Sequence, residues 1–501
     1  MTLRSISVPA LTQAQMLEIF NSSDAAYNGQ FIVGVHTTGI YCLPSCKAKK
    51  PKPENVSFYA TLEDARAAGF RACKKCKPDE FYLGEFAGET LIEGLLEALR
   101  LEPARFRNVE SVVAASGVGS SKLYELFRVH LHTTPLEVLL SARLEAAQRA
   151  LLLSNRPVTE IAFEVGFESL SSFNENFRSS QHTTPLEFRR VRDGEGFSLH
   201  LPRDYPLEFV LKHIARDGES LTERIVGHML EAAWWVNGVA CVVGIALEPD
   251  LARVQVLEGQ LKPGDYLELY GKVLKVLGLS VNTEKFETLL EADPVLRTLH
   301  RSSKGFRFPL LASPWDGLMR AIIGQQITTG FAATLRKRLT ELAGTPTSSG
   351  LYAPPTIEAV AALEQIQLLE LGFTRSRADY LIGAARAVQE GRLPLEALRF
   401  KSATRLERTL LAQKGVGPWT AHYLMMQAYG LLDCVPVGDT GVGEALKQFF
   451  ALEERPDARG TLERMEVFRP YRSLATFHLW QYLGAQGREK KAPQESARGP
   501  S

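Results

Sequence analysis

The sequence predicts a multidomain α+β protein with four structured parts: a small cysteine-rich α+β domain, an all-α domain, an antiparallel-sheet subdomain and a final helical domain. Its 501 residues correspond to three or four domains, at about 150 residues per domain. Four of the six cysteines lie within residues 42–76, and the segment at 127–137 is repeated at 177–187. After residue 197 the hydrophobic period becomes strand-like, and from about residue 301 it is helical again. We therefore expect domain boundaries near residues 82–88, 190–197 and 300.

The overall composition excludes several classes of protein. Hydrophobic residues make up 45% and charged residues 23% of the chain, and no apolar run approaches the roughly 18 residues of a membrane span. The N-terminus has no basic segment followed by a continuous apolar stretch, so we expect no secretion signal, no membrane partner and a cytoplasmic location. A net charge of +1 argues against a histone-like polycation but allows local basic surfaces.

The cysteine-rich domain is expected at residues 1–82, with a helix at 11–20, a strand at 31–38 and a helix at 61–68. Its cysteines form two close pairs, Cys42-x3-Cys46 and Cys73-x2-Cys76. Two such pairs in a chain without a secretion signal indicate a tetrathiolate metal site rather than disulfides. Zinc favours four thiolates in a tetrahedron, so we predict one Zn²⁺ held by all four cysteines. The spacing alone leaves open a site that only stabilises a small zinc domain.

A resemblance over about residues 10–82 rests on the segments around the cysteines, TTGIYCLPSC, NVSFYA and AGFRACKKCKPD. They resemble the N-terminal domain of Ada, the methyl-phosphotriester repair family. The resemblance implies that Cys42 accepts a methyl group from a methylphosphotriester in DNA while bound to zinc. Between Cys42 and Pro78, nine basic side chains stand against three acidic ones, which favours a polyanionic partner. His36 and Leu43 stand where the family is expected to have a basic residue.

This zinc site suggests an electrostatic hypothesis. Methylation converts one thiolate into a thioether, so the formal charge of the site becomes less negative by one. A less negative site repels phosphates less, so methylation of Cys42 is expected to strengthen DNA binding.

The all-α domain is expected at residues 88–190 and contains two copies of a helix-turn-helix, with Gly117 and Gly166 at the turns. The repeated segments FRVHLHTTPLE and FRSSQHTTPLE lie 50 residues apart, and FRR follows the second. This region resembles the AraC-type DNA-binding domain. The candidate DNA-contacting residues lie on the second helix of each copy: Lys122, Arg128, Asn174 and Arg178, with Ser121, Tyr124, Ser171 and Ser172 beside them.

Hydrophobic residues at helical spacing on the same two helices are expected to lie in the core: Leu123, Phe127, Phe173 and Phe177. Residues 81–190 carry 11 basic and 14 acidic side chains, which is unusual for a surface that lies on DNA. Nonspecific DNA binding, or a role only in holding the neighbouring domains together, therefore remains open for this domain.

The segment at 191–196, VRDGEG, is expected to be a linker. After it, strand-like runs such as FSLHL, ACVVGIA and ARVQVL predict an antiparallel sheet with helices at residues 197–300. The following domain, 301–484, is expected to be helical apart from a loop at 344–356. The polar residues 485–501 are expected to form a disordered tail.

The segment LLAQKGVGPWTAHYL near the C-terminal end contains a helix, the turn KGVG and a second helix. This is a helix-hairpin-helix, in which Gly415 and Gly417 let backbone N–H groups approach a DNA phosphate without reading sequence. Residues 197–484 resemble the AlkA-type 3-methyladenine DNA glycosylases. The resemblance includes SPWDGLMRAIIGQQITT (313–329), LGFTRSRADYL (371–381) and YRSLATFHLW (471–480). A hairpin without a catalytic role is the alternative.

By this resemblance Asp439, about twenty residues after the hairpin, is the catalytic carboxylate. An anion there would stabilise the oxocarbenium-like sugar of N-glycosidic cleavage, although an aspartate in this position can also be a simple N-cap. Trp419 occupies the position of the Schiff-base lysine of bifunctional relatives and cannot form an imine. The resemblance therefore implies a monofunctional glycosylase.

The same resemblance places Trp419, Tyr423 and Trp480 in the base pocket, where aromatic faces favour cationic methylated purines such as 3-methyladenine and 7-methylguanine. The target base must first be turned out of the helix. The residue that fills its space in the DNA matches Gln326, where the family can have leucine. No four-cysteine cluster accompanies this domain, so we expect no iron–sulfur centre.

The combination predicts a DNA alkylation repair enzyme whose partner is double-stranded DNA with alkylated bases and methylphosphotriesters. The Pro-Cys-His-Arg motif of the alkylguanine methyltransferase domain of Ada does not occur in this sequence. Three hypotheses remain. The chain can also be an alkylation-responsive transcription activator, with promoter DNA and RNA polymerase as partners. It can be a repair enzyme only, whose N-terminal half targets DNA. A regulator with an inactive glycosylase domain is disfavoured by Asp439 and the hairpin.

Overall fold

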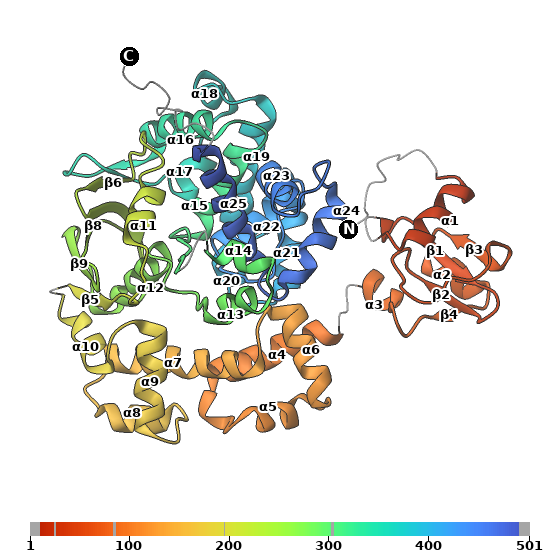
Figure 1. Cartoon of the computed structure of the whole chain (residues 1–501), viewed down its shortest axis with the longest axis horizontal. Helices are drawn as coiled ribbons and strands as arrows, with labels where there is room; N and C mark the ends of the chain where they lie inside the picture. The colour runs from red at the N-terminus through yellow and green to blue at the C-terminus, as the bar shows by residue number, and fades with distance from the viewer. Residues whose placement is uncertain (1–10, 25–26, 84–86, 195, 302–304, 490–501) are drawn as a thin grey trace, which may run out of the picture. The chain divides into compact units, whose positions relative to one another are not determined.

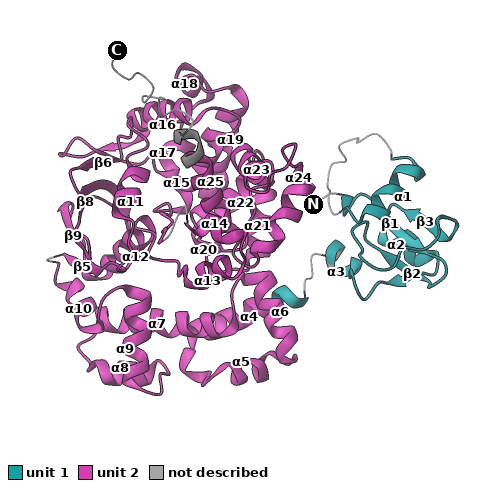
Figure 2. Cartoon of the chain, in the orientation of Figure 1, with its two compact units in different colours: residues 1–91 teal, residues 92–501 magenta. Residues whose placement is uncertain are grey.

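The computed structural model describes residues 11–24, 27–83, 87–194, 196–301 and 305–489. The chain forms two compact units, residues 1–91 and 92–501 (Figures 1 and 2). Residues 1–10 of the predicted zinc domain and residues 490–501 of the predicted tail lie outside the described residues. Among the described helices, none has both the length and the apolar character needed to cross a membrane.

The smaller unit is built on a four-stranded sheet in the order β3-β1-β2-β4, in which β2 and β4 are parallel and the other neighbours are antiparallel. Its elements are α1 (Gln13–Ser22), β1 (Ile32–Val35), β2 (Ile40–Cys42), β3 (Val56–Tyr59), α2 (Leu62–Ala67), β4 (Arg71–Ala72) and α3 (Pro78–Leu83). Strand β2 ends at Cys42, and β4 ends immediately before Cys73. The parallel pairing therefore brings both cysteine pairs to the same edge of the sheet.

Seven helices follow: α4 (Ala87–Leu101), α5 (Val109–Ser116), α6 (Ser120–Leu131), α7 (Pro135–Leu153), α8 (Val158–Glu164), α9 (Leu170–Gln181) and α10 (Pro185–Arg190). Gly117 and Gly166 have positive φ, as a tight turn between two helices requires. The repeated TTPLE is a helix start, because Thr134 and Thr184 each form a capping box with the glutamate three residues on and a proline opens the helix.

The second helix of each helix-turn-helix copy, α6 or α9, carries its predicted core side chains on one face. The expectation is confirmed, since the following four side chains are fully buried: Leu123, Phe127, Phe173 and Phe177. Burial of this face leaves the opposite, polar face of each helix to solvent.

A five-stranded antiparallel sheet in the order β5-β9-β8-β7-β6 follows, as the sequence predicts. Its strands and the two helices beside it are β5 (Phe197–His200), α11 (Leu207–Ile214), β6 (Glu223–Val226), β7 (Met229–Val236), β8 (Val239–Leu247), β9 (Leu251–Glu258) and α12 (Tyr266–Val276). In β7, Trp234 is buried, and its neighbour Trp235 donates its indole N–H to the carbonyl of Pro354.

The remaining elements are mainly helical (Figure 1). They are α13 (Glu284–Ala292), α14 (Leu296–Arg301), α15 (Pro314–Gly324), α16 (Thr329–Ala343), β10 (Thr345–Pro346), β11 (Tyr352–Ala353), α17 (Ile357–Ala361), α18 (Gln365–Glu370), α19 (Arg375–Gln389), α20 (Leu395–Leu398), α21 (Ala403–Leu411), α22 (Pro418–Gln427), α23 (Thr440–Phe449), α24 (Ala458–Met465) and α25 (Arg472–Glu489). Helix α25 continues five residues into the segment 485–501 that we predicted as a disordered tail, so that predicted boundary is wrong.

The first residues of the segment 191–196, which we predicted to be a linker, are folded against the neighbouring elements. Val191 opens a short 3₁₀ helix that ends at Asp193, and its side chain is buried. It belongs to a hydrophobic cluster that continues from α7–α10 into the sheet, where Phe188 and Phe197 both contact the ring of Tyr270 at 4.8 Å. The helix-turn-helix region and the sheet therefore share one core within residues 92–501.

The histidine that precedes TTPLE in each repeat anchors that repeat to the rest of the unit. His132 and His182 both adopt left-handed backbone at the end of a helix. The Nδ1 of His132 accepts from the N–H of Asp433 at 3.3 Å, and the Nε2 of His182 bonds the carbonyl of Leu279 at 3.1 Å. Burial lowers the pKa of His132 to about 4, so its ring is neutral at pH 7 and can accept this bond.

Loss of the Phe188 side chain is expected to destabilise residues 92–501 strongly. Phe188 is fully buried against Phe177 and Tyr270, and a phenylalanine-to-alanine change in such a core costs about 3–5 kcal/mol. Phe163→Ala is the matched control, because that ring is 55% exposed and its loss should cost under about 0.5 kcal/mol. Denaturant titration of both variants measures the difference. Equal and small losses would contradict the shared core.

Candidate functional site

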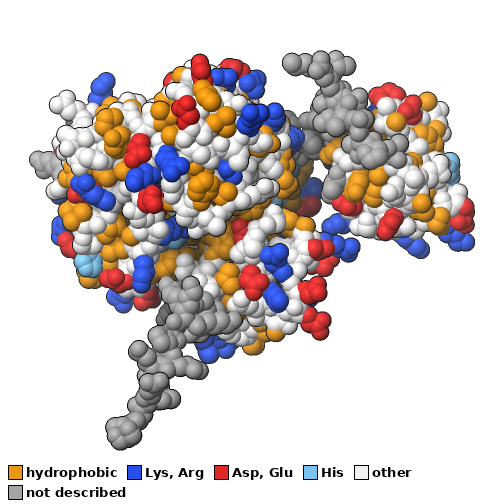
Figure 3. Space-filling view, turned by 90° about the horizontal axis from the view of Figure 1, so that it is seen from above, with side chains coloured by type: hydrophobic (Ala, Val, Ile, Leu, Met, Phe, Trp, Pro, Cys, Tyr) orange, Lys and Arg blue, Asp and Glu red, His pale blue; other side chains and the backbone are white. Residues whose placement is uncertain are grey.

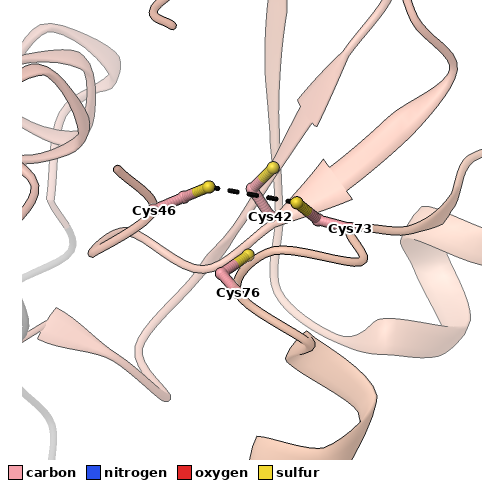
Figure 4. A group of neighbouring side chains, drawn as sticks. All are labelled: Cys42, Cys46, Cys73 and Cys76. Atoms are coloured by element: carbon pink, nitrogen blue, oxygen red, sulfur yellow. Dashed lines mark hydrogen bonds between the residues drawn. The ribbon is translucent and has the colours of Figure 1, made fainter. Parts of the chain in front are cut away.

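Four cysteine sulfurs of the smaller unit point toward one centre (Figure 4). The sulfur atoms of Cys42, Cys46, Cys73 and Cys76 all lie within 4.8 Å of one another, and none is in a disulfide. The Sγ atoms of Cys46 and Cys73 are 4.0 Å apart (Figure 4). This arrangement brings together all four metal ligands that the sequence predicts.

The chemistry of the four thiols fits a zinc ion. Hydrogen bonding to Cys46 and Cys76, together with burial, raises the pKa of the Cys42 thiol far above its ordinary value. Four thiolates cannot gather in a buried site without a cation, and a divalent cation that prefers tetrahedral sulfur ligands removes the repulsion. The protein therefore binds one Zn²⁺ through a tetrathiolate site.

The four sulfurs differ in exposure and in the backbone donors around them. Cys42 is 4% exposed, whereas Cys76 is only partly buried. Cys76 accepts the N–H of Leu43 at 3.4 Å, and Cys46 accepts a backbone bond from Ala48. Among the described residues, no backbone N–H is recorded as donating to Cys42. An N–H donor withdraws charge from a thiolate, so these bonds lower the nucleophilic character of Cys46 and Cys76 but not that of Cys42 or Cys73.

The larger unit contains a cleft of about 2580 Å³ that Asp439, Trp419, Tyr423 and Trp480 help to line. Asp439 is the N-cap of α23, and its Oδ1 accepts the N–H of Val442 at 2.8 Å. The same oxygen accepts the indole N–H of Trp480 at 3.0 Å, and Oδ2 accepts that of Trp419 at 2.9 Å. The carboxylate is therefore an N-cap and, at the same time, an oriented anion in a cleft.

Two of the aromatic residues beside Asp439 stack on each other, and a third comes from another helix. Trp419 and Tyr423 lie one turn apart on α22, and their rings stack at 5.1 Å with 19° between the planes. Trp480 comes from α25 and is partly buried. The structure thus brings the three predicted pocket residues to the same cleft as the predicted catalytic carboxylate.

The hairpin between α21 and α22 borders this cleft. Gly415 has a φ of +88°, and a Cβ there would collide with the ring of Tyr380, so only glycine fits. Gly417 is the exposed N-cap of α22, where the first backbone N–H groups of the helix have no partner within the helix. A DNA phosphate can approach these N–H groups, because neither glycine carries a side chain.

Gln326 lies in the short loop between α15 and α16, and it also lines the cleft. It is exposed, and its backbone has a φ of +54°, in the left-handed region that side chains rarely adopt. The sequence predicts that Gln326 fills the space left by the target base. It does not identify Gln325, Arg377 and Tyr380, which contact this loop or the hairpin turn and hold them in position. These three residues lie within the quoted motifs, but their roles depend on contacts between distant segments.

The predicted DNA-contacting residues of the helix-turn-helix copies lie on the outer faces of α6 and α9. Lys122, Arg128 and Arg178 are exposed, and Asn174 is partly buried. Lys122 pairs with Glu125 at 3.0 Å. On the face seen in Figure 3, basic and acidic side chains of the larger unit are interspersed, in agreement with the nearly neutral composition.

Three families match successive parts of the chain. The metal binding domain of Ada matches residues 15–79, a helix-turn-helix domain matches residues 112–191, and the HhH-GPD superfamily of base excision DNA repair proteins matches residues 319–470. The first two matches include the sequence segments that carry the Ada and AraC resemblances, whereas the third includes 371–381 and most of 313–329 but ends before 471–480. The three matches agree with the zinc domain, the helix-turn-helix domain and the glycosylase domain predicted from the sequence.

One curated relative matches nearly the whole chain, and a second matches part of it. The chain is 29% identical over 482 residues to a probable bifunctional transcriptional activator/DNA repair enzyme AlkA of Mycobacterium tuberculosis, a match that covers 92% of this chain and 95% of the relative. It is 31% identical over 181 residues to the bifunctional transcriptional activator/DNA repair enzyme AdaA of Bacillus subtilis, which covers 36% of this chain and 84% of that protein.

A solved structure agrees with the fold of the C-terminal part. The 3-methyladenine DNA glycosylase of Archaeoglobus fulgidus superposes with a TM-score of 0.52 at 24% identity, over 57% of this chain and 97% of that protein. The zinc-ligating cysteines, the helix-turn-helix repeat and the glycosylase fold are thus joined in one polypeptide. The chain belongs to the family of bifunctional transcriptional activator/DNA repair enzymes, as a fusion of an Ada-type zinc domain, an AraC-type helix-turn-helix domain and an AlkA-type DNA glycosylase.

Proposed function

We propose that the chain repairs alkylated DNA in two ways, by hydrolysing the glycosidic bond of alkylated purines and by accepting the methyl group of methylphosphotriesters. The observation that carries the first activity is the Asp439 carboxylate, held by two indole N–H groups in a cleft that the DNA-binding hairpin borders. Release of free base from alkylated DNA, with an abasic site left behind, tests this activity.

Asp439 acts on the sugar of a nucleotide that has been turned out of the helix. The bond between C1′ and the base nitrogen breaks with its electron pair going to the base, so a cationic alkylated purine leaves as a neutral base. The positive charge that develops on the sugar lies against the carboxylate, which the two indoles and the N–H of Val442 orient. Water then adds to C1′ and releases a proton to solvent.

The stacked faces of Trp419 and Tyr423 provide the preference for alkylated purines. A purine that carries a methyl group at N3 or N7 is a cation, and aromatic faces attract cations by about 0.5–2 kcal/mol. Trp480 contributes a third aromatic side chain to the same cleft. We therefore assign 3-methyladenine and 7-methylguanine as the preferred bases and double-stranded DNA as the partner.

Borohydride treatment during the reaction is expected to trap no covalent complex between protein and DNA. By the resemblance, Trp419 occupies the position of the Schiff-base lysine of bifunctional relatives. An indole, unlike an amine, cannot form an imine. Denaturing gel electrophoresis of labelled DNA after borohydride addition makes the measurement. Alkali cleavage of a parallel sample is the control that abasic sites have formed. A trapped adduct alongside that cleavage would refute monofunctional chemistry.

The second activity assigns Cys42 as the methyl acceptor. Among the described residues no backbone N–H donates to its sulfur, so it is more nucleophilic than Cys46 or Cys76, and the resemblance to Ada distinguishes it from Cys73. Bound zinc keeps the sulfurs as thiolates at neutral pH. The S–CH₃ bond forms as the O–CH₃ bond breaks and its electron pair stays on oxygen. The phosphotriester becomes an ordinary phosphodiester, and Cys42 becomes a thioether, so each molecule reacts once.

A regulatory role accompanies repair in this proposal. Arg128 and Arg178 are exposed and can reach base edges and phosphates of DNA, and Lys122 can do so by exchanging its ion pair with Glu125 for a phosphate. Methylation of Cys42 makes the zinc site less negative by one charge and thereby strengthens binding to promoter DNA, where RNA polymerase is the partner. Footprinting on the DNA upstream of the coding sequence tests this role. Protection only after methylation supports it, whereas no protection in either state would support repair alone.

A further inference from the structure

The loop that carries Gln326 and the DNA-binding hairpin come from distant parts of the sequence, yet one side chain joins them. The Nε2 of Gln325 donates to the carbonyl of Gly415 at 2.8 Å and to Oγ1 of Thr420 at 3.0 Å. Gly415 lies in the hairpin turn, and Thr420 lies in the first turn of α22. A single amide therefore joins the loop to the hairpin turn and to the first turn of α22.

A second bond fixes the backbone of the same loop. Arg377, on α19, donates its Nη2 to the carbonyl of Gln325 at 2.7 Å. The side chain of Arg377 is buried, at 8% exposure, and burial lowers the pKa of its guanidinium. A buried guanidinium is costly, so its position under this loop indicates that the geometry of the loop matters. The ring of Tyr380, also on α19, occupies the space that a side chain at position 415 would need.

These contacts surround a backbone conformation that is unfavourable on its own. Gln326 is exposed and has a φ of +54°, which costs a residue with a side chain of the order of 1 kcal/mol. Such a conformation persists only where its neighbours determine it. The contacts of Gln325 and Arg377 fix the backbone on the N-terminal side of Gln326. The N-cap Thr328 fixes it on the C-terminal side.

We propose that Gln325 is a positioning residue for base flipping, which sets the distance between the phosphate-binding hairpin and the side chain of Gln326 that fills the vacated space. The hairpin holds the DNA backbone, so Gln326 enters the duplex correctly only if the loop is fixed relative to the hairpin. Gln325 touches neither the sugar nor the base in this proposal. The inference rests on the proposed glycosylase function.

The test uses Gln325→Met in the full zinc-loaded chain, because methionine keeps the length of the side chain but has no N–H donor. Gln365→Met is the matched control: it removes an amide that donates to Asp379 on the same helix α19 but does not reach the loop. The measurements are the single-turnover rate of base release from a duplex with one 7-methylguanine and the affinity for undamaged duplex.

A wild-type protein that releases no base would refute the proposed function itself, and the comparison below applies once that release is seen. With the lesion opposite cytosine, Gln325→Met is expected to be at least tenfold slower than wild type, while its affinity for undamaged DNA stays within twofold. With the lesion opposite an abasic analogue, flipping is easier because no base pair opposes it, and the variant should regain most of the wild-type rate.

Recovery on the unpaired lesion also shows that the variant is folded and that its catalytic carboxylate works. An equal loss of rate on both duplexes would overturn the inference, because Gln325 would then act on the chemical step or on the fold. A wild-type rate on the paired lesion, or the same loss in Gln365→Met, would overturn it as well.

Discussion

Asp439→Asn is expected to abolish base release from alkylated DNA, with a fall of at least about 100-fold in the single-turnover rate. Asparagine keeps the shape of the side chain and can still accept the N–H of Val442, so the start of α23 is preserved. It removes the negative charge, which is the property that stabilises the sugar cation. The affinity for undamaged duplex should change little, because the hairpin is untouched.

Asp457→Asn is the matched control for this prediction. Asp457 is also an aspartate N-cap, of α24, and its side chain accepts the N–H of Gly460 at 2.7 Å. A loss confined to Asp439→Asn shows that the charge at this site, rather than the cap, is required. If Asp439→Asn retained more than a tenth of the wild-type rate, Asp439 could not be the catalytic carboxylate.

Cys42→His is expected to eliminate methyl transfer from methylphosphotriesters while the protein still binds zinc. Imidazole nitrogen is an ordinary fourth ligand in a site with three cysteines, so the metal and the fold around it are retained. The acceptor thiolate, however, is gone. Cys76→His is the matched variant, because it makes the same ligand change at the more exposed cysteine. It should keep methyl transfer to Cys42.

Metal analysis and peptide mapping of the two variants decide which sulfur reacts. Equal zinc content with a methyl group only in Cys76→His supports the assignment to Cys42. The reverse pattern, a methyl group only in Cys42→His, would mean that exposure rather than the lack of a backbone donor selects the acceptor. This comparison is informative because Cys42 is 4% exposed.

The features predicted correctly from the sequence depend on short spacing. Two cysteine pairs fix a metal site because each pair lies in one turn, and the parallel pairing of β2 with β4 needs only to bring the two turns together. The hairpin glycine Gly415 is recognisable because its left-handed backbone excludes other residues. The catalytic role of Asp439, about twenty residues after that hairpin, stays a prediction that the resemblance implies.

The features missed depend on contacts between distant segments. Local composition suggested a linker at 191–196, but Val191 is buried in a core that the sheet completes. The link from Gln325 to Gly415 spans 90 residues of sequence, so no local pattern reports it. Helix α25 extends past Gly484, although the polar composition there is typical of disorder. Tertiary packing decided the first two of these outcomes.

The most direct test of the account uses one duplex that carries a single methylphosphotriester and a single 7-methylguanine. The zinc-loaded full chain is incubated with this duplex, and the protein mass, the peptide map and the free base are measured in the same reaction. The account predicts one added methyl group, on Cys42, together with released 7-methylguanine and an unbroken strand with an abasic site. Methylation without base release, or base release with every cysteine unmodified, would contradict the claim that one chain carries both repair activities.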